Sequence, residues 1–257
     1  MDEKLPFGLI TFFSTLGHGG FRDSYKATIE DLAQNIDLAL FPVKLANIKY
    51  PTGEKDYAIG MQNWLRFKGF RCILNEGNWA DNDVSKHKEY LSDVIKLLHD
   101  NELNTLPFTF WMEGDVVLRV REGKLIDYIQ KSAQILVNNK NILRVGITDR
   151  LDEFSRINGV KEKHGLDRQA IRIEGEDSFY LHNDLFNFRV SICRQRDLFQ
   201  AARILLHNFE KLSYHCEMGF SDAIKMLSDE RYCFVDFEPK LIQHLHGETE
   251  EFKYSKA

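Results

Sequence analysis

The sequence predicts an α/β fold with a mostly parallel central sheet that is flanked by helices. Short apolar runs alternate with longer stretches in which apolar residues recur every three or four positions, as in amphipathic helices. Most of the short runs end at a cluster of Gly, Asn, Asp or Pro, which terminates a strand. Strands separated by helices of this length form βαβ units with parallel strands. The length of 257 residues suits one large domain or two small ones.

In the first half of the chain, each expected strand is followed by an expected helix. The strand at 9–13 ends before Gly17-His18-Gly19-Gly20, and Ser85 is the expected N-cap of a helix that runs to His99. The strand at 108–112 ends at Glu113-Gly114-Asp115. The other elements expected here are a helix at 22–36, a strand at 37–43, a helix at 57–68 and a strand at 70–74.

The second half continues this alternation up to the C-terminal tail. Residues 149–168 are strongly polar and are expected to form a surface excursion, and the charged tail 248–257 is expected to fray. No internal repeat is present, and the β-α order across the whole length favours a single domain over 1–257. The expected helices are 124–137, 197–212 and 217–227, and the expected strands are 142–147, 186–192 and 232–237.

The composition is that of a soluble globular protein. The 34 Lys and Arg against 39 Asp and Glu give a net charge of −5, and 43% of the residues are hydrophobic, which excludes a largely disordered chain. No apolar stretch approaches the roughly 18 residues of a membrane span, and Met1-Asp2-Glu3-Lys4 does not resemble a signal peptide. We therefore expect a cytoplasmic protein without a membrane span.

The four cysteines are expected to be small buried hydrophobic residues. They lie far apart and form no CxxC pair, which argues against a zinc ribbon, a thioredoxin-like motif or a disulfide scaffold. The residues concerned are Cys72, Cys193, Cys216 and Cys233.

Glu113-Gly114-Asp115 is the first candidate for chemistry. In open α/β sheets, ligands bind beyond the carboxyl ends of the strands, where this segment lies. Residues at i and i+2 of a strand point the same way, and Gly114 between them would let a ligand approach the backbone. Glu113 and Asp115 could then share a divalent cation. The alternative is an ordinary solvated turn, in which acidic residues and glycine are common.

Two later segments carry further candidates. His244 and His246 would share one face of an extended segment and could join carboxylates on a metal ion, although histidines near a C-terminus are often surface residues. Glu217 opens an expected helix and could act as a general base, although the helix dipole favours a carboxylate there for structural reasons alone.

The order of these segments along the chain resembles that of nucleotide-sugar glycosyltransferases with the GT-A fold. The similarity rests on the strand and loop at 9–20, the segment 110–115, the strand at 186–194, Glu217-Met218-Gly219-Phe220 and His244-Leu245-His246-Gly247. It implies a Rossmann-type, mostly parallel sheet with a smaller acceptor-side subdomain. Residues 1–118 would bind the nucleotide sugar, and 119–247 would bind the acceptor and contain the catalytic residues.

The resemblance also implies roles for individual residues. Glu113-Gly114-Asp115 would stand for the Asp-x-Asp motif of the family, with Asp115 as the ligand of Mn²⁺ or Mg²⁺ and Glu113 near the metal or the ribose. His246 or His244 would be the late metal ligand, and Glu217 would be the catalytic base of an inverting enzyme. The residues bordering the nucleotide would be Thr11, Ser14, Thr15 and Arg22.

The reaction expected from the resemblance is metal-dependent hexosyl or pentosyl transfer from a nucleoside-diphosphate sugar, with UDP as the expected carrier. The acceptor hydroxyl could belong to a glycan, a lipid, or hydroxymethylcytosine in phage DNA. Several basic clusters could form a rim for DNA phosphates, or could be ordinary surface charge: Lys44-Lys49-Lys55, Arg66-Lys68-Arg71, Arg119-Arg121-Lys124 and Arg194-Arg196. A nucleotidyltransferase and a non-catalytic nucleotide-binding module are the alternative classes.

Overall fold

A nine-stranded sheet forms the centre of the part of the chain that the structure describes. This computed structural model describes residues 6–15, 21–77, 84–114, 116–118, 124–147, 170–173, 179–183, 189–208, 216–230, 233–237 and 242–244. In spatial order, the strands are β3 (Arg71–Glu76), β2 (Val43–Tyr50), β1 (Phe7–Ser14), β4 (Phe108–Glu113), β9 (Val190–Arg194), β6 (Arg144–Ile147), β10 (Phe234–Phe237), β8 (Phe179–His182) and β7 (Ala170–Ile173).

Seven of these nine strands run in one direction, and only β9 and β8 run against them. The pairs β4–β9, β9–β6, β10–β8 and β8–β7 are antiparallel, whereas the other four pairs are parallel. The predicted mostly parallel sheet is therefore confirmed. One edge of the sheet holds the carboxyl ends of β1, β2, β3 and β4 together with the beginning of β9, and we call it the carboxyl edge. The opposite edge is the amino edge.

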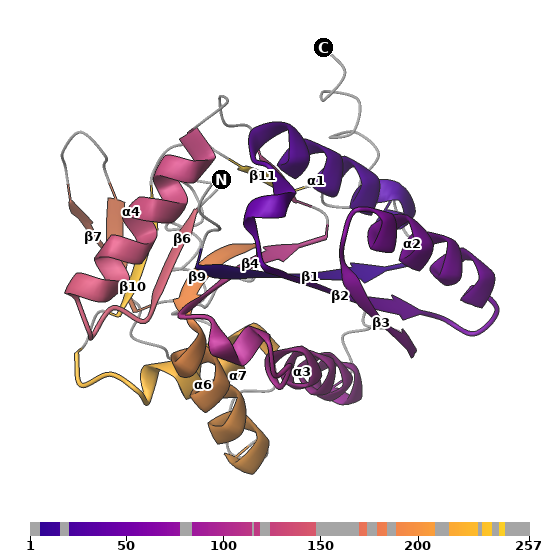
Figure 1. The fold of residues 1–257 in the computed structure, drawn as a ribbon. Coiled ribbons are helices and arrows are strands. Elements are labelled where there is room, and N and C mark those ends of the chain that lie inside the picture. Colours follow the sequence, from indigo (N-terminus) through magenta and orange to yellow (C-terminus); the bar gives the residue numbers. More distant parts are fainter. Residues whose placement is uncertain are drawn as a thin grey trace.

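Helices cover both faces of the sheet and make a three-layer α/β arrangement (Figure 1). One face packs on α1 (Phe21–Asn35), α2 (Lys55–Phe67) and α4 (Lys124–Asn138). The other face packs on α3 (Val84–Leu98), α6 (Gln195–Asn208) and α7 (Cys216–Lys225). All six helices begin and end close to the predicted limits, because each presents an apolar stripe that the sheet buries.

The predicted strand at 37–43 is wrong. Residues 38–40 instead form the 3₁₀ turn η2 (Leu38–Leu40), in which Oδ1 of Asp37 accepts a hydrogen bond from the backbone N–H of Ala39 at 2.9 Å. Pro42 has no N–H to give to a sheet, and β2 begins only at Val43. The apolar run before Pro42 therefore forms a turn, whereas β2 is a buried strand although its sequence contains Lys and Asn residues.

Two hydrophobic cores lie on the two faces of the sheet. The first lies under α1, α2 and α4, and the second lies under α3, α6 and α7. Trp111 of β4 is completely buried in the second core, where its ring lies 5.0 Å from that of Phe12 and 5.9 Å from that of Phe220. Successive side chains of a strand point to opposite faces of the sheet, so they pack alternately in the two cores.

Some short strands were not predicted. They are β5 (Val116–Leu118), β7, β8 and β11 (Ile242–His244), and β5 and β11 pair with each other in a separate two-stranded sheet. Their lengths of three or four residues leave no periodic pattern to detect. The predicted excursion at 149–168 and the tail 248–257 lie outside the described residues.

A buried charged network joins the strands on the α6 and α7 face of the sheet. Both guanidinium Nη atoms of Arg144 (β6) donate to the carboxylate of Asp236 (β10), at 2.9 and 3.0 Å. Nε2 of His182 (β8) lies 2.7 Å from Oδ2 of Asp236, and Nε of Arg144 donates to the hydroxyl of Ser191 (β9) at 2.6 Å. Burial alone would raise the pKa of Asp236, but Arg144 and His182 stabilise the carboxylate and lower it to about 2.

No helix within the described ranges is both long enough and apolar enough to span a membrane.

Candidate functional site

The end of β4 lies in the middle of the carboxyl edge. Glu113 is its last residue and is half-buried. It faces the same side as Trp111, which packs in the core under α3, α6 and α7. The backbone N–H of Glu113 donates to the carbonyl of Arg189 at 2.9 Å, where the chain enters β9. Glu113 and Arg189 therefore occupy adjacent positions of two antiparallel strands at this edge.

Helix α1 holds the backbone directly after Glu113. The hydroxyls of Ser24 and Thr28, both buried, donate to the carbonyl of Gly114 at 3.1 and 2.9 Å. The same helix packs against β5, which begins two residues later. This anchoring fixes the direction in which the chain leaves the main sheet.

Gly114 has a different role from the one predicted. A Cβ at this position would lie 2.2 Å from the carbonyl oxygen of Phe12 and 2.2 Å from the ring of Phe13. Strand β1 thus fills the space that was expected to admit an approaching ligand. The glycine is required by packing between β4 and β1.

We expect Gly114→Ala to destabilise the protein by about 1–3 kcal/mol, because the new methyl group must displace the backbone of β1. Gly60→Ala is the matched control. Gly60 lies inside α2, and an alanine methyl group there would face open space, so this substitution should stabilise by about 0.5–1 kcal/mol. Urea denaturation of both variants measures the difference. Equal effects of the two substitutions would contradict the packing explanation.

The pairing of β5 with β11 brings the two candidate metal-binding segments together. His244 is in register with Val116, which directly follows Asp115 in the sequence. The segments are more than a hundred residues apart along the chain, and only this ladder places their backbones side by side. Asp115 and His246 lie outside the described residues, as do the side-chain positions of His244.

Helix α7 points its N-terminus toward the carboxyl edge. Just after its C-terminal end, the Ser228 hydroxyl donates to the carbonyl of Asn141 at the amino edge, at 3.2 Å. Nearer its start, the ring of Phe220 packs on Trp111, two residues before the end of β4. Glu217 precedes Phe220 by one turn, about 4.5 Å along the axis, on the side of Glu113. Its side chain is not among those described.

The four predicted nucleotide-bordering residues occupy different positions. The predicted role of Thr11 is wrong. Thr11 is completely buried under the α1 and α2 layer, and it lies three residues and about 10 Å before the end of β1, so it cannot border a ligand. Ser14 is the last residue of β1 and is half-buried at the carboxyl edge. Thr15 follows it, completely buried, and its hydroxyl has no hydrogen-bond partner among the described residues. Arg22 lies in the first turn of α1, and its side chain is not described.

The donor set at this edge suits a hard divalent cation. Carboxylates such as those of Glu113 and Asp115 are oxygen ligands for Mg²⁺ or Mn²⁺, and imidazole is accepted by Mn²⁺. The register of β5 and β11 supports this fit, because it places His244 opposite Val116, the residue that follows Asp115 in the sequence. Within the described ranges themselves, no three His, Cys, Asp or Glu side chains converge on a possible metal position.

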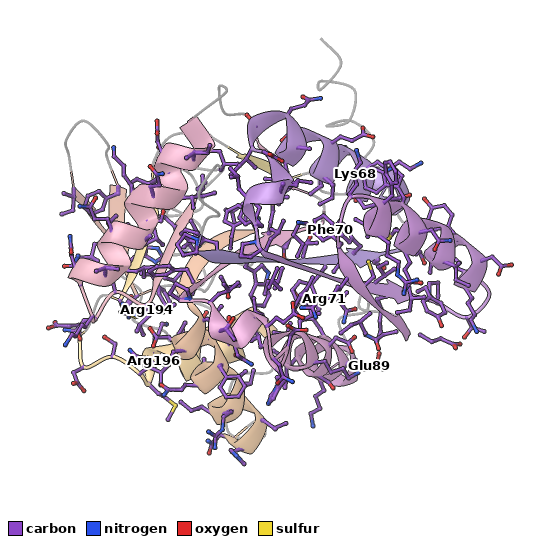
Figure 2. All side chains as sticks on the ribbon, viewed as in Figure 1. Lys68, Phe70, Arg71, Glu89, Arg194 and Arg196 are labelled. Atoms are coloured by element: carbon purple, nitrogen blue, oxygen red, sulfur yellow. The ribbon has the colours of Figure 1, made fainter. Side chains whose placement is uncertain are left out.

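Part of each of three basic clusters lies away from this site. Lys44, Arg71 and Arg194 lie at the amino edge, at the beginning of β2, the beginning of β3 and the end of β9. Figure 2 shows Arg194 and Arg196 near the start of α6, well apart from Lys68 and Arg71. Among the described residues, these basic side chains therefore do not form one continuous rim.

Most of these positive charges are also engaged within the protein. The guanidinium of Arg194 donates to the carbonyls of Leu136, Asn139, Lys140 and Ile142 around the end of α4. Arg71 pairs with Asp100 at 2.8 Å. Lys49 lies at the carboxyl edge, but its side chain is 4% exposed and pairs with Asp93 and Glu89 of α3 at 3.1 and 3.2 Å. Residues 119 and 121 lie outside the described ranges.

The described cysteines are structural. Cys193 and Cys233 are buried and Cys72 is half-buried, and all three are free thiols, as the sequence predicts. Burial raises the pKa of Cys72 and of Cys233 to about 11 and raises that of Cys193 further. These thiols therefore stay protonated and are poor nucleophiles at neutral pH.

Solved structures share the arrangement of this chain. A chain assigned as a glucose-1-phosphate thymidylyltransferase from Bacillus anthracis, in complex with a sucrose, matches at a TM-score of 0.50 and 6% identity, with 97% of this chain and 93% of that chain covered. This chain and that chain therefore share a fold. At 6% identity, the similarity concerns the fold and does not establish a common activity.

Two glycosyltransferase structures match with lower scores. Mouse xyloside xylosyltransferase 1 in its apo form matches at a TM-score of 0.42 and 12% identity, with 86% of this chain and 80% of that chain covered. The galactosyltransferase LgtC, in complex with donor and acceptor sugar analogues, matches at 0.45 and 10% identity, with 88% and 72% covered. At such scores, neither match bears on the activity of this chain. No protein-family model and no curated protein matches the sequence.

Proposed function

We propose that this protein is a metal-dependent glycosyltransferase that moves a sugar from a nucleoside-diphosphate sugar to an acceptor hydroxyl. The observation that carries the proposal is the convergence of three segments at the carboxyl edge of the sheet. These are the end of β4 with Glu113, the β5–β11 ladder with His244 opposite Val116, and the N-terminal end of α7 with Glu217. In open α/β sheets, this edge is where ligands bind.

The residue types at this edge suit the charge that develops in glycosyl transfer. When the bond from the anomeric carbon to the nucleoside diphosphate breaks, negative charge accumulates on the departing phosphate oxygens. A divalent cation held by Asp115 and His246 or His244, with Glu113 nearby, would act there as a Lewis acid. In an inverting reaction, Glu217 would accept the proton of the acceptor hydroxyl, and its place at the start of α7 is one where the helix dipole favours a carboxylate.

The finer parts of the proposal concern the donor and the acceptor. We propose UDP as the sugar carrier and a hexose or pentose as the transferred group, in keeping with the motif order of the sequence. Ser14 and Thr15 lie at the end of β1, at this edge, and would border the nucleotide. We propose a glycan, a lipid or hydroxymethylcytosine in DNA as the acceptor. The described basic residues do not support DNA as the acceptor, because Lys44, Arg71 and Arg194 lie at the amino edge, away from the site.

A thermal-shift screen of nucleoside diphosphates and their sugars, with and without Mn²⁺, tests this proposal. At a ligand concentration a hundred times the Kd, binding adds about 2.7 kcal/mol of stability. We therefore expect a clear rise in Tm with one nucleobase only when Mn²⁺ is present. The positive donor is then incubated with candidate acceptors, and release of the nucleoside diphosphate is measured. If no nucleotide raises the Tm with Mn²⁺, a non-catalytic protein with an incidental acidic segment is favoured.

A nucleotidyltransferase is the second candidate, because the thymidylyltransferase structure shares the fold. This activity would join a nucleoside triphosphate to a sugar phosphate and release pyrophosphate. The two candidates are separated by their products: pyrophosphate from a triphosphate supports the second, and nucleoside diphosphate from a sugar nucleotide supports the first.

A further inference from the structure

We propose that two copies of this chain associate through β3 and form one continuous sheet across a two-fold axis. β3 is the outermost strand at one end of the nine-stranded sheet, and no other described strand pairs with its outer side (Figure 1). An edge strand presents backbone N–H and C=O groups that have no partner in the sheet, and these groups can pair with a second strand. The inference is independent of the proposed function.

The hydrogen bonds between β2 and β3 determine which backbone groups of β3 face outward. The N–H of Gly77, directly after the strand, donates to the carbonyl of Tyr50 at 2.8 Å, so the backbone of Gly77 points toward β2. This direction alternates from residue to residue along a strand. Cys72, Leu74 and Glu76 therefore direct their N–H and C=O groups away from the sheet, where a second strand can reach them.

The middle of β3 lacks the features that protect an edge strand. Natural proteins protect such edges with charged residues, proline or bulges. Residues 72–75 contain no charge and no proline, their ladder with β2 is regular, and Ile73 and Leu74 are only half-buried. The strand at the other end of the sheet, β7, has four residues and contains Arg172. Of the two outermost strands, β3 is therefore better suited to pairing.

The outward groups select one register for the pairing. When two identical strands pair antiparallel across a two-fold axis, the residue on the axis faces itself. With Leu74 on the axis, Cys72 pairs with Glu76 of the partner subunit, and all three outward residues form hydrogen bonds. A register centred on Ile73 would leave Glu76 without such a pair. The two carboxyl edges then point in opposite directions, which leaves both candidate sites open.

This register also brings opposite charges together, once on each side of the axis. Burial raises the pKa of the Cys72 thiol to about 11, and the charge of Arg66 opposes this rise, so the guanidinium lies near β3. Glu76 of the partner subunit, opposite Cys72, is then beside Arg66. Arg66 is exposed, and its guanidinium makes no hydrogen bond or ion pair with another described residue. Glu76 is exposed and accepts one hydrogen bond, from Thr52 at 2.7 Å, through Oε1.

An apolar residue on α2 extends the proposed interface. Ile59 lies seven residues before Arg66, on the same side of the helix, and is 36% exposed. Trp64 lies on the side of α1, where its ring is 5.4 Å from that of Tyr25. Ile59 and Arg66 therefore face away from α1, over the free edge of β3. A second copy paired with β3 would cover Ile59 and remove its apolar surface from water.

A charge-swap experiment tests the proposal, with sedimentation velocity at several protein concentrations as the measurement. The wild type should form a dimer whose fraction rises with concentration. Arg66→Glu and Glu76→Arg each place like charges at both contacts, and each should raise the dimer Kd about 10-fold or more. An equimolar mixture of these two variants restores both opposite-charge contacts, so a mixed dimer should form as readily as that of the wild type.

Arg203→Glu is the matched control for the charge swap. Arg203 is an exposed residue of α6, which packs on β4 and β9 in the middle of the sheet, so this variant should dimerise as the wild type does. Circular dichroism checks that each variant is folded. A wild type that stays monomeric at every concentration would overturn the proposal, and so would single variants that dimerise normally or a mixture that does not recover.

A cross-linking experiment tests the register separately. Residue 74 faces itself across the axis with a Cα separation of about 5.5 Å, which suits a disulfide. Oxidised glutathione should therefore link two copies of Leu74→Cys. The wild type, which carries the same native cysteines, gives the background. In Ile73→Cys the new thiol projects from the other face, opposite Asn75 of the partner subunit, and should form a link much more slowly. Equal or faster linking of Ile73→Cys would contradict the register centred on Leu74.

Discussion

Replacing Asp115 with asparagine should reduce sugar transfer by about a thousandfold or more while the protein stays folded. Asparagine keeps the shape of the side chain but removes the negative charge through which Asp115 would hold the divalent cation. Without the cation, the departing diphosphate loses several kcal/mol of charge stabilisation, and each 1.4 kcal/mol corresponds to about a tenfold change in rate. Release of nucleoside diphosphate from the donor, with and without acceptor, measures the loss.

Asp229→Asn is the matched control for this experiment. Asp229 is an exposed residue after α7 and follows Ser228, which bonds Asn141 at the amino edge, so the same chemical change there should leave transfer and metal dependence intact. The Tm of both variants without ligand should stay close to that of the wild type. An Asp115→Asn protein that still transfers sugar at the wild-type rate would sink the metal-dependent mechanism.

Replacing Asp236 with asparagine is expected to destabilise the fold by about 3–5 kcal/mol. The substitution leaves the guanidinium of Arg144, which is 0% exposed, without its charged partner in the sheet interior. It also removes the ionised acceptor that lies 2.7 Å from His182, so β10 loses a link to both of its neighbours. Urea denaturation measures the loss, and Asp229→Asn, at an exposed position after α7, should change stability by less than about 0.5 kcal/mol.

A double variant tests whether the cost comes from the unpaired charge. Arg144→Met with Asp236→Leu replaces the pair by apolar side chains and should recover much of the stability that Asp236→Asn loses. Gly146 limits this recovery, because the Arg144 guanidinium occupies the place where a Cβ of Gly146 would lie. If the double variant were as unstable as Asp236→Asn, the cost would not come from the unpaired charge, and the charged pair would be stabilising in its own right.

The same carboxylate gives a pH dependence with a definite sign. The pKa of Asp236 falls from 3.8 to about 2 in the folded protein, so the folded state holds the ionised form more strongly than the unfolded chain does. This contribution is therefore fully present above about pH 4 and is lost as the pH falls from 4 toward 2. In the Asp236→Asn variant, the free energy of unfolding should change less over this interval than in the wild type.

Much of the fold follows from the sequence because its elements are long and periodic. Helices such as α3 and α4 show their apolar stripe in the sequence, and strands such as β4 read as short apolar runs that end in glycine or charged residues. Residues 37–43 show the limit of this approach, because a local hydrogen bond from Ala39 to Asp37 and the fixed ring of Pro42 outweigh the apolar composition. In β2, Lys49 is buried only because α3 supplies Asp93 and Glu89.

The α/β class, the mostly parallel sheet, and the position of Glu113 at the end of a strand all follow from the amino-acid sequence. Which distant segments meet is visible only in the folded protein: the antiparallel insertion of β9 between β4 and β6, Arg189 beside Glu113, and His244 opposite Val116. Helix and strand patterns record which side of an element is buried, and they do so over a few residues. Strand register and the pairing of charges depend on contacts between segments far apart in the chain, which leave no local pattern.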